Sequence, residues 1–262
     1  MLDIFLIVLV ILLAVTILVY LGYGFYLYLK QRDLLYHPMQ QIKESHIEEE
    51  NFELQGCEIK VSILNKANKK AIIYFGGNKE NVDKNAKIFS ELFTEHSVYL
   101  IKYRGYAGST CSPSEKAIYF DATHIYDEIK ENHEEVTIIG RSLGSGVATF
   151  VAAQKKIDKL ILVAPFDSIQ SVVQSKFPLY PMKWMLKDRY DSLSRAKEIT
   201  APTLIVVAQN DEVISMLQTK RLQNAFLNQP KFVMINGANH SNIVLSPQYY
   251  DTLYEFIHTQ TL

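Results

Sequence analysis

The predicted fold is decided by one stretch of sequence, Val136-Thr137-Ile138-Ile139-Gly140-Arg141-Ser142-Leu143-Gly144-Ser145-Gly146. Its β-branched beginning predicts a buried strand, and the small residues that follow it predict a helix. A Gly-x-Ser-x-Gly pattern between a strand and a helix predicts a sharp turn that exposes the Ser142 hydroxyl. A glycine-rich turn with an incidental serine is the plainer reading, and the strand before and helix after disfavour it. A dinucleotide-binding loop is also disfavoured, because no acidic residue suited to a ribose ends the next strand.

Short apolar strands alternate with helical patterns on both sides of this stretch. The predicted strands are Glu58–Leu64, Ala71–Phe75, Val98–Tyr103, Val136–Gly140, Leu160–Ala164, Thr203–Ala208 and Phe232–Ile235. The predicted helices are Asn81–Glu95, Glu115–Asn132, Gly144–Gln154, Ser215–Leu227 and Pro247–His258. This alternation predicts an α/β fold with a mostly parallel central sheet flanked by helices, whose functional residues gather at the carboxyl ends of the strands.

A serine hydroxyl needs a base, and a histidine base needs an orienting carboxylate. Asp211 follows the strand Thr203–Ala208 and is the predicted acid; Glu212 beside it and Asp167 after Leu160–Ala164 are alternatives. His240 follows the last predicted strand. It is the only histidine that lies in a loop directly after a strand and downstream of Asp211, so it is the predicted base.

The strand Ala71–Phe75 ends in Gly76-Gly77-Asn78, where glycines let the backbone approach a developing oxyanion closely. A plain tight turn is the alternative. The second expected donor is the Leu143 N–H, at the start of the helix after Ser142.

The first residues predict a membrane anchor. From Ile4 to Leu21 every residue except Thr16 is apolar or aromatic, and this character continues to Leu29. At about 1.5 Å per residue, such a helix spans a hydrocarbon core of about 30 Å. A cleaved signal peptide would have a basic start, a shorter apolar stretch and a small-residue cleavage site. We therefore expect an anchor over residues 1–32, embedded through residues 4–29, and a catalytic domain over 33–262.

Charge and cysteine content narrow the class of protein. Lys30 and Arg32 follow the apolar stretch, so the positive-inside rule predicts a single-pass protein with a cytoplasmic domain. Lys and Arg together number 27 against 28 Asp and Glu, which gives no basic excess for nucleic acid. No zinc-type Cys/His spacing is present, and we expect no metal or cofactor. Cys57 and Cys111 could form one disulfide, but two free thiols are the expected state.

The chain resembles the Bem46-like group of membrane-anchored α/β-hydrolases, within the class of serine aminopeptidase-type or α/β-hydrolase-domain proteins. The segments that carry the resemblance are Gly77-Asn78, Tyr103–Ser109, Ser112–Glu115, Gly140–Gly146, Pro165–Ser168, Asp188–Ser192, Asp211 and Gly237–His240. The resemblance implies Ser142 as nucleophile, Asp211 as acid and His240 as base, with the amides of Asn78 and Leu143 as the oxyanion hole. Two positions depart from the family pattern: Gly76 stands where a histidine is usual, and Cys111 where a glycine is usual.

A short insertion separates the strands that end at Ala164 and begin at Thr203. Within it, Phe177–Leu186 is apolar and aromatic and contains two prolines. We expect a small lid region at about 166–200, or a patch that faces the membrane; packing beside the sheet is the alternative. An apolar opening of the site near a bilayer suits a small acyl-containing substrate.

The expected function is hydrolysis of an ester or thioester by serine chemistry. The alternatives are a peptidase of the serine aminopeptidase type, a non-catalytic anchored scaffold and a soluble secreted esterase.

Overall fold

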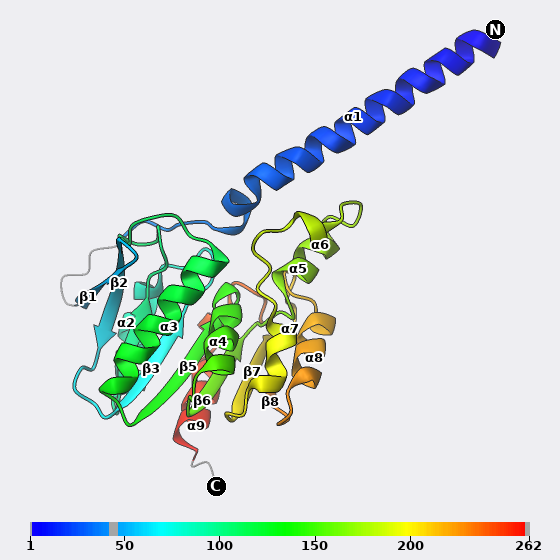
Figure 1. Ribbon diagram of the computed structural model, residues 1–262. Helices are drawn as coiled ribbons and strands as arrows, with labels where there is room; N and C mark the ends of the chain where they lie inside the picture. The colour runs from blue at the N-terminus through cyan, green and yellow to red at the C-terminus, as the bar shows by residue number, and fades with distance from the viewer. Residues whose placement is uncertain (1, 42–46, 260–262) are drawn as a thin grey trace.

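The computed structural model describes residues 2–41 and 47–259 and shows one long helix that leads into an α/β domain. Helix α1 (Leu2–Leu35) stands away from the domain over most of its length (Figure 1). From Ile4 to Leu29 its large apolar side chains are exposed, except for Leu27, which is buried. The helix is long and apolar enough to cross a membrane.

The domain is built on a sheet that contains eight strands in the described part of the chain, in the order β1-β2-β4-β3-β5-β6-β7-β8. The strands are β1 (Glu48–Leu54), β2 (Cys57–Leu64), β3 (Lys70–Phe75), β4 (His96–Ile101), β5 (Glu135–Arg141), β6 (Lys159–Val163), β7 (Thr203–Ala208) and β8 (Lys231–Ile235). The six strands β3 to β8 pair in parallel with their neighbours, whereas β1 with β2 and β2 with β4 pair antiparallel. The predicted α/β-hydrolase fold is confirmed.

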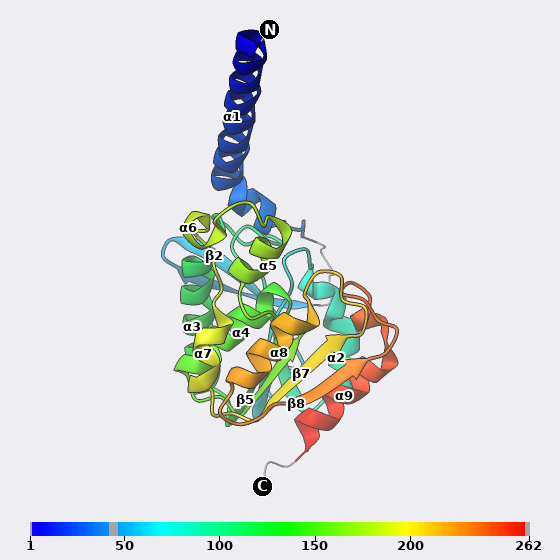
Figure 2. The same cartoon turned by 90° about the vertical axis from the view of Figure 1, so that its right-hand side faces the viewer.

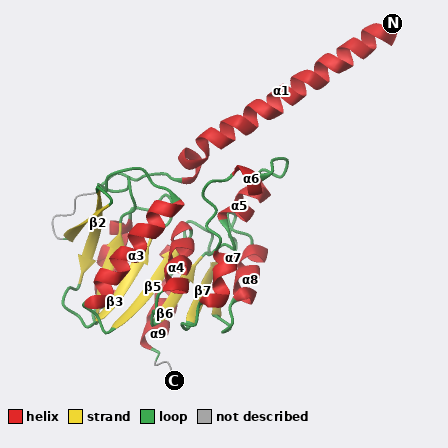
Figure 3. Ribbon diagram, in the orientation of Figure 1, coloured by secondary structure: helices red, strands yellow, loops and turns green. Residues whose placement is uncertain are grey.

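Helices cover both faces of the sheet (Figures 2 and 3). On one face lie η1 (Val82–Asn85), α2 (Ala86–Leu92) and α9 (Pro247–His258); on the other lie α3 (Glu115–Glu131), α4 (Leu143–Gln154) and α8 (Met216–Ala225). Alternate residues of each strand enter the two cores. In β3, Ile72 and Tyr74 pack on the α2 and α9 side, and Ile73 and Phe75 pack on the α4 side. This is the period-2 burial that a sheet covered on both faces requires.

The insertion, which we define as residues 166–200 between β6 and β7, contains three short helices and a 3₁₀ turn. They are α5 (Ile169–Lys176), α6 (Met182–Met185), α7 (Ser192–Arg195) and η2 (Ala196–Glu198). α5 and α6 lie above the sheet beside the C-terminal part of α1 (Figure 1). The remaining 3₁₀ turn, η3 (Ile243–Leu245), precedes α9.

Strand β1 was absent from the sequence prediction. Its first four residues are Glu48, Glu49, Glu50 and Asn51, and only Phe52 and Leu54 are buried. It forms a hairpin with β2 through Gln55 and Gly56, which have φ angles of 54° and 73°. Two left-handed residues are typical of a tight two-residue hairpin turn. The strand therefore forms because it pairs with β2 at the sheet edge. Its amino-acid composition by itself would not predict a strand.

The expectation of two free thiols is wrong, because Cys57 and Cys111 form a disulfide with a Cα–Cα distance of 5.9 Å. The antiparallel pairing of β2 with β4 causes this proximity, since it returns the loop after β4 to the beginning of β2. In that loop Thr110 donates its N–H to Glu58 O at 2.8 Å. Cys111 has a φ of 61°, so it keeps the left-handed conformation that favours glycine.

Candidate active site

Ser142 lies in a strained turn between β5 and α4. Its φ of 49° and ψ of −116° are unusual for a residue with a side chain. The flanking glycines explain how the turn fits. A Cβ at Gly144 would lie 1.9 Å from Phe75 O, and one at Gly140 would lie 2.3 Å from Gly144 O. Only glycine leaves room for β3, β5 and α4 to approach so closely, so the sequence pattern dictates this turn.

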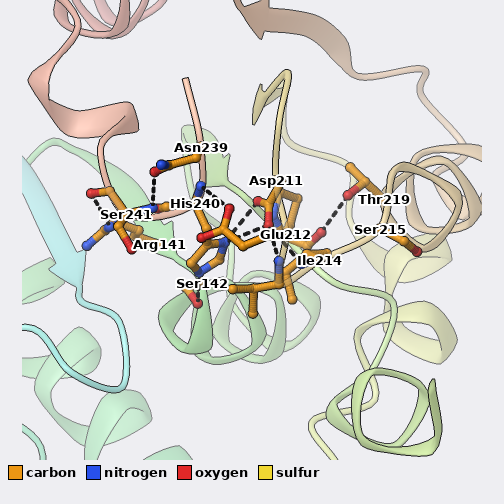
Figure 4. Close-up of polar contacts among 12 residues, drawn as sticks. Arg141, Ser142, Asp211, Glu212, Ile214, Ser215, Thr219, Asn239, His240 and Ser241 are labelled. Carbon is orange, nitrogen blue, oxygen red and sulfur yellow. Dashed lines mark hydrogen bonds and ion pairs between the residues drawn. The ribbon is translucent and has the colours of Figure 1, made fainter. Parts of the chain in front are cut away.

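Ser142, His240 and Asp211 form a continuous hydrogen-bonded chain (Figure 4). Ser142 Oγ lies 2.9 Å from His240 Nε2, and His240 Nδ1 lies 2.9 Å from Asp211 Oδ2 and 3.1 Å from Oδ1. An ionised carboxylate only accepts, so Nδ1 carries the proton and Nε2 is left to accept from the serine hydroxyl. The three residues follow β5, β7 and β8, whose carboxyl ends meet at one edge of the parallel sheet.

Asp211 is held as an anion. Burial alone would raise the pKa of its carboxyl group, but hydrogen bonds from His240 and from the Ile214 and Val213 amides lower it below the ordinary value. The two amides donate to Asp211 Oδ1 at 2.8 and 2.9 Å. The carboxylate is thus both ionised and fixed in direction before any substrate binds.

The two alternative acids lie elsewhere. Glu212 accepts the backbone N–H of His240 at 3.3 Å and so contacts the main chain of the histidine. Asp167 accepts the Ser168 N–H at 2.6 Å and lies 3.7 Å from an Arg221 nitrogen. Of the three predicted candidates, only Asp211 bonds to the imidazole.

The loop Gly76–Asn78 lies beside Ser142. A Cβ built on Gly77 would be 3.6 Å from Ser142 Cβ. Tyr103 donates its hydroxyl to Gly76 O at 2.9 Å, and Tyr106 donates its hydroxyl to Asn78 O at 2.9 Å. Within residues 2–41 and 47–259, neither the Asn78 N–H nor the Leu143 N–H donates to a protein acceptor. Both amides therefore remain available to an oxygen near Ser142.

Glu80 and Arg141 brace this site, and the sequence analysis missed both. Arg141 Nη1 lies 2.9 Å from Glu80 Oε2, which also accepts the Gly77 N–H at 2.8 Å. Arg141 Nη2 donates to His240 O at 3.2 Å. Burial would raise the pKa of Glu80, but Arg141 and the Gly77 amide lower it. The ion pair thus ties the loop after β3 to the loop that carries His240.

Steric crowding explains why glycine stands at position 76, where the Bem46-like pattern has a histidine. A Cβ there would lie 2.6 Å from Val82 Cγ1. The Glu80 carboxylate and the Tyr103 hydroxyl hold the loop instead. For the Glu80–Arg141 pair, the sequence shows an arginine directly before Ser142 and a glutamate shortly after the glycines. Nothing in the sequence indicates that these two residues meet.

A cavity of about 660 Å³ opens in front of Ser142. This volume is typical of sites that bind small molecules. Apolar lining residues come from α1, the insertion and the loop after β7, and they include Leu27, Leu34, Ile169, Val172, Met182 and Ile214. Polar lining residues include Asn78, Glu80, Arg141 and His240. The described residues contain no group of three or more His, Cys, Asp or Glu side chains placed to hold a metal ion.

Comparison with known proteins assigns this chain to a family. The profile of the alpha/beta hydrolase domain matches residues 98–251. An uncharacterized protein of Mycobacterium tuberculosis is 29% identical over 150 residues, which cover 56% of this chain and 53% of that protein. The lysophosphatidylserine lipase ABHD12 of Xenopus tropicalis is 32% identical over 178 residues, which cover 58% of this chain and 46% of that protein. The matches thus span about half the length of these relatives.

Solved structures agree on the fold. The crystal structure of a soluble variant of monoglyceride lipase from Saccharomyces cerevisiae superposes with a TM-score of 0.63 at 15% identity, over 85% of this chain and 98% of that one. Sequence identity at this level supports a shared fold and nothing further. Taken with the profile match, the strained turn at Ser142 and the order of the strands, these likenesses show that the chain belongs to the alpha/beta hydrolase domain family.

Proposed function

We propose that this protein is a serine hydrolase that cleaves a carboxylic ester or thioester of an acyl-chain-bearing substrate through an acyl-enzyme. The observation that carries the proposal is the hydrogen-bonded chain from Ser142 through His240 to Asp211. The apolar side of the cavity supports an acyl chain, and the lipase among its relatives supports ester hydrolysis.

In the proposed mechanism His240 Nε2 takes the proton from Ser142 as Oγ attacks the carbonyl carbon. Asp211 orients the imidazole and stabilises its cationic form. The Asn78 and Leu143 amides donate to the oxyanion of the tetrahedral intermediate. His240 then protonates the leaving alcohol or thiol, and a water molecule, deprotonated by the same nitrogen, releases the fatty acid from Ser142.

A fluorophosphonate probe tests this proposal, because it reacts only with an activated serine. We expect the wild-type protein to be labelled and Ser142→Ala to lose the label. Ser145→Ala is the matched control, since Ser145 is buried in α4 and donates to Ser142 O. A folded wild-type protein that takes no label would favour the non-catalytic scaffold. A peptidase would be revealed by faster turnover of aminoacyl amides than of acyl esters.

We propose that α1 anchors the domain in a single pass. The charges of Lys30 and Arg32 favour a cytoplasmic domain, whereas the Cys57–Cys111 disulfide is typical of an oxidising compartment. Alkylation with a PEG-maleimide during cell lysis decides between the two. A cytoplasmic domain predicts modification of both cysteines without reductant, and modification only after reduction would overturn that placement.

A further inference from the structure

Three polar side chains in the C-terminal half of α1 bind the insertion. The Tyr20 ring stacks on Tyr180 with centroids 4.6 Å apart, and its hydroxyl donates to Leu179 O at 2.7 Å. About one turn before the helix end, the adjacent residues Gln31 and Arg32 also bind the insertion. The Gln31 amide accepts from the Lys187 N–H at 2.6 Å, and Arg32 forms a two-pronged pair with the buried Asp188 at 2.8 and 3.2 Å. These contacts define where α1 sits over the domain.

The end of α1 is also bonded to the loop beside Ser142. Asn78 Nδ2 donates to Leu35 O at 2.9 Å, and the His37 N–H donates to the Tyr106 hydroxyl at 3.0 Å. The same Tyr106 hydroxyl donates to Asn78 O. The helix end and the candidate oxyanion loop therefore form one hydrogen-bonded unit.

One face of α1 lines the cavity in front of Ser142. Leu27, Gln31 and Leu34 recur at helical spacing and all contribute to its wall. Leu27 is only 6% exposed, whereas its neighbours Tyr26 and Tyr28 are 50% and 40% exposed. The insertion contributes further apolar side chains to the wall, namely Ile169, Val172, Val173, Phe177, Met182 and Leu186. Helix α1 and the insertion thus both contribute apolar wall to this cavity, which we call the channel.

Beyond the residues that line this channel, α1 and the tip of the insertion extend toward the proposed bilayer (Figure 1). Tyr20, which is bonded to the insertion, precedes Lys30 by ten residues, which is about 15 Å along the helix axis. The tip of the insertion exposes Leu179 at 77% and Trp184 at 80%. Exposed tryptophan and tyrosine beside an apolar helix are typical of the membrane interface. The composition of the tip is therefore that of a segment at the headgroup level of a bilayer that α1 crosses.

We propose that α1 is a wall of the acyl site as well as an anchor. The substrate's acyl chain leaves the bilayer sideways between α1 and the insertion, lies along Leu27 and Leu34, and presents its carbonyl to Ser142 without crossing water. Leu27 and Leu34 are then residues that select acyl-chain length. This inference rests on the hydrolase function proposed above and names its substrate class: single acyl chains drawn from a lipid surface.

The test uses the full chain in lipid nanodiscs and compares kcat/KM for palmitoyl and acetyl p-nitrophenyl esters. A tryptophan in the wall shortens the channel, so Leu27→Trp should lower the palmitoyl-to-acetyl ratio by about tenfold or more. Leu29→Trp is the matched control. Leu29 is on the same helix but is 58% exposed and faces away from the cavity, so the ratio should keep its wild-type value.

Leu34→Trp supplies a second variant, because Leu34 is 48% exposed and a larger side chain there is less disruptive to folding than at Leu27. An unchanged ratio in both wall variants, with fluorophosphonate labelling intact, would overturn this inference and leave the hydrolase function standing. A wild-type protein that is folded but takes no label would instead overturn the proposed function. The two failures are therefore distinct.

Discussion

The turn at Ser142 and the contact between α1 and the insertion both shape the candidate site, but they are held in different ways. At the turn, a Cβ on Gly144 would meet the backbone of β3 at 1.9 Å. At the helix contact, a Cβ on Gly24 would meet the Tyr180 ring at 2.9 Å, which is the movable end of a side chain. The turn is held by backbone atoms that cannot move aside, whereas α1 is held by side-chain contacts that can adjust. A change of the same size should therefore have very different effects in the two regions.

The largest expected effect on the reactivity of Ser142 is that of Gly144→Ala. Because the new methyl group cannot avoid Phe75 O, we expect loss of fluorophosphonate labelling and a free energy of unfolding lower by about 3 kcal/mol. Gly24→Ala should keep the label, and Gly22→Ala, which meets nothing within 4 Å, should behave as wild type. Labelling kinetics and thermal unfolding measure both properties. Equal damage from Gly24→Ala and Gly144→Ala would contradict the contrast between the regions.

Asp211→Asn should reduce kcat by about 10⁴-fold, because the amide cannot hold the tautomer that leaves Nε2 free to accept a proton. Hydrolysis of the acetyl ester at saturating substrate measures the effect. Asp167→Asn is the control, since Asp167 makes no contact with His240. A larger loss of kcat in Asp167→Asn than in Asp211→Asn would mean that the wrong carboxylate has been assigned.

Arg141→Met should have an intermediate effect on catalysis. It leaves the Glu80 carboxylate buried without its cation, so we expect unfolding to become easier by about 3–5 kcal/mol. The loops that carry Asn78 and His240 lose their common brace, so kcat should fall by about 100-fold with little change in KM.

A double variant separates bracing from mere stability. Glu80→Gln together with Arg141→Met removes both charges and should recover much of the lost stability while kcat stays low. If kcat recovers in parallel with stability, the pair has no positioning role beyond folding.

The smallest expected effect is that of Arg32→Ala. Arg32 is half exposed, and Asp188 keeps the Tyr36 hydroxyl and the Glu115 N–H as partners, so stability should change by about 1 kcal/mol or less. The palmitoyl-to-acetyl ratio should fall a few-fold as α1 loosens. Lys30→Ala, which breaks only an exposed pair with Asp33 on the same helix, is the control. An effect as large as that of Arg141→Met would mean that α1 is held as rigidly as the turn.

The sequence by itself determined the parts of this protein that depend on neighbouring residues. The apolar strands, the Gly-x-Ser-x-Gly turn and the long apolar helix follow from side-chain periodicity and backbone sterics, and they were predicted with boundaries within a few residues. The structure also brings Ser142, Asp211 and His240 together as their positions after β5, β7 and β8 predicted, because parallel strands end at a common edge. Their catalytic role stays a proposal.

Tertiary structure alone decided the features that join distant segments. β1 exists through its pairing with β2, and the disulfide exists because β2 and β4 are neighbours. The Glu80–Arg141 pair joins residues 61 positions apart, and the bonds from Arg32 to Asp188 span 156. No local pattern predicts such contacts. The sequence around a charged or polar side chain does not show whether that side chain is bound by water or by a residue that the fold brings near.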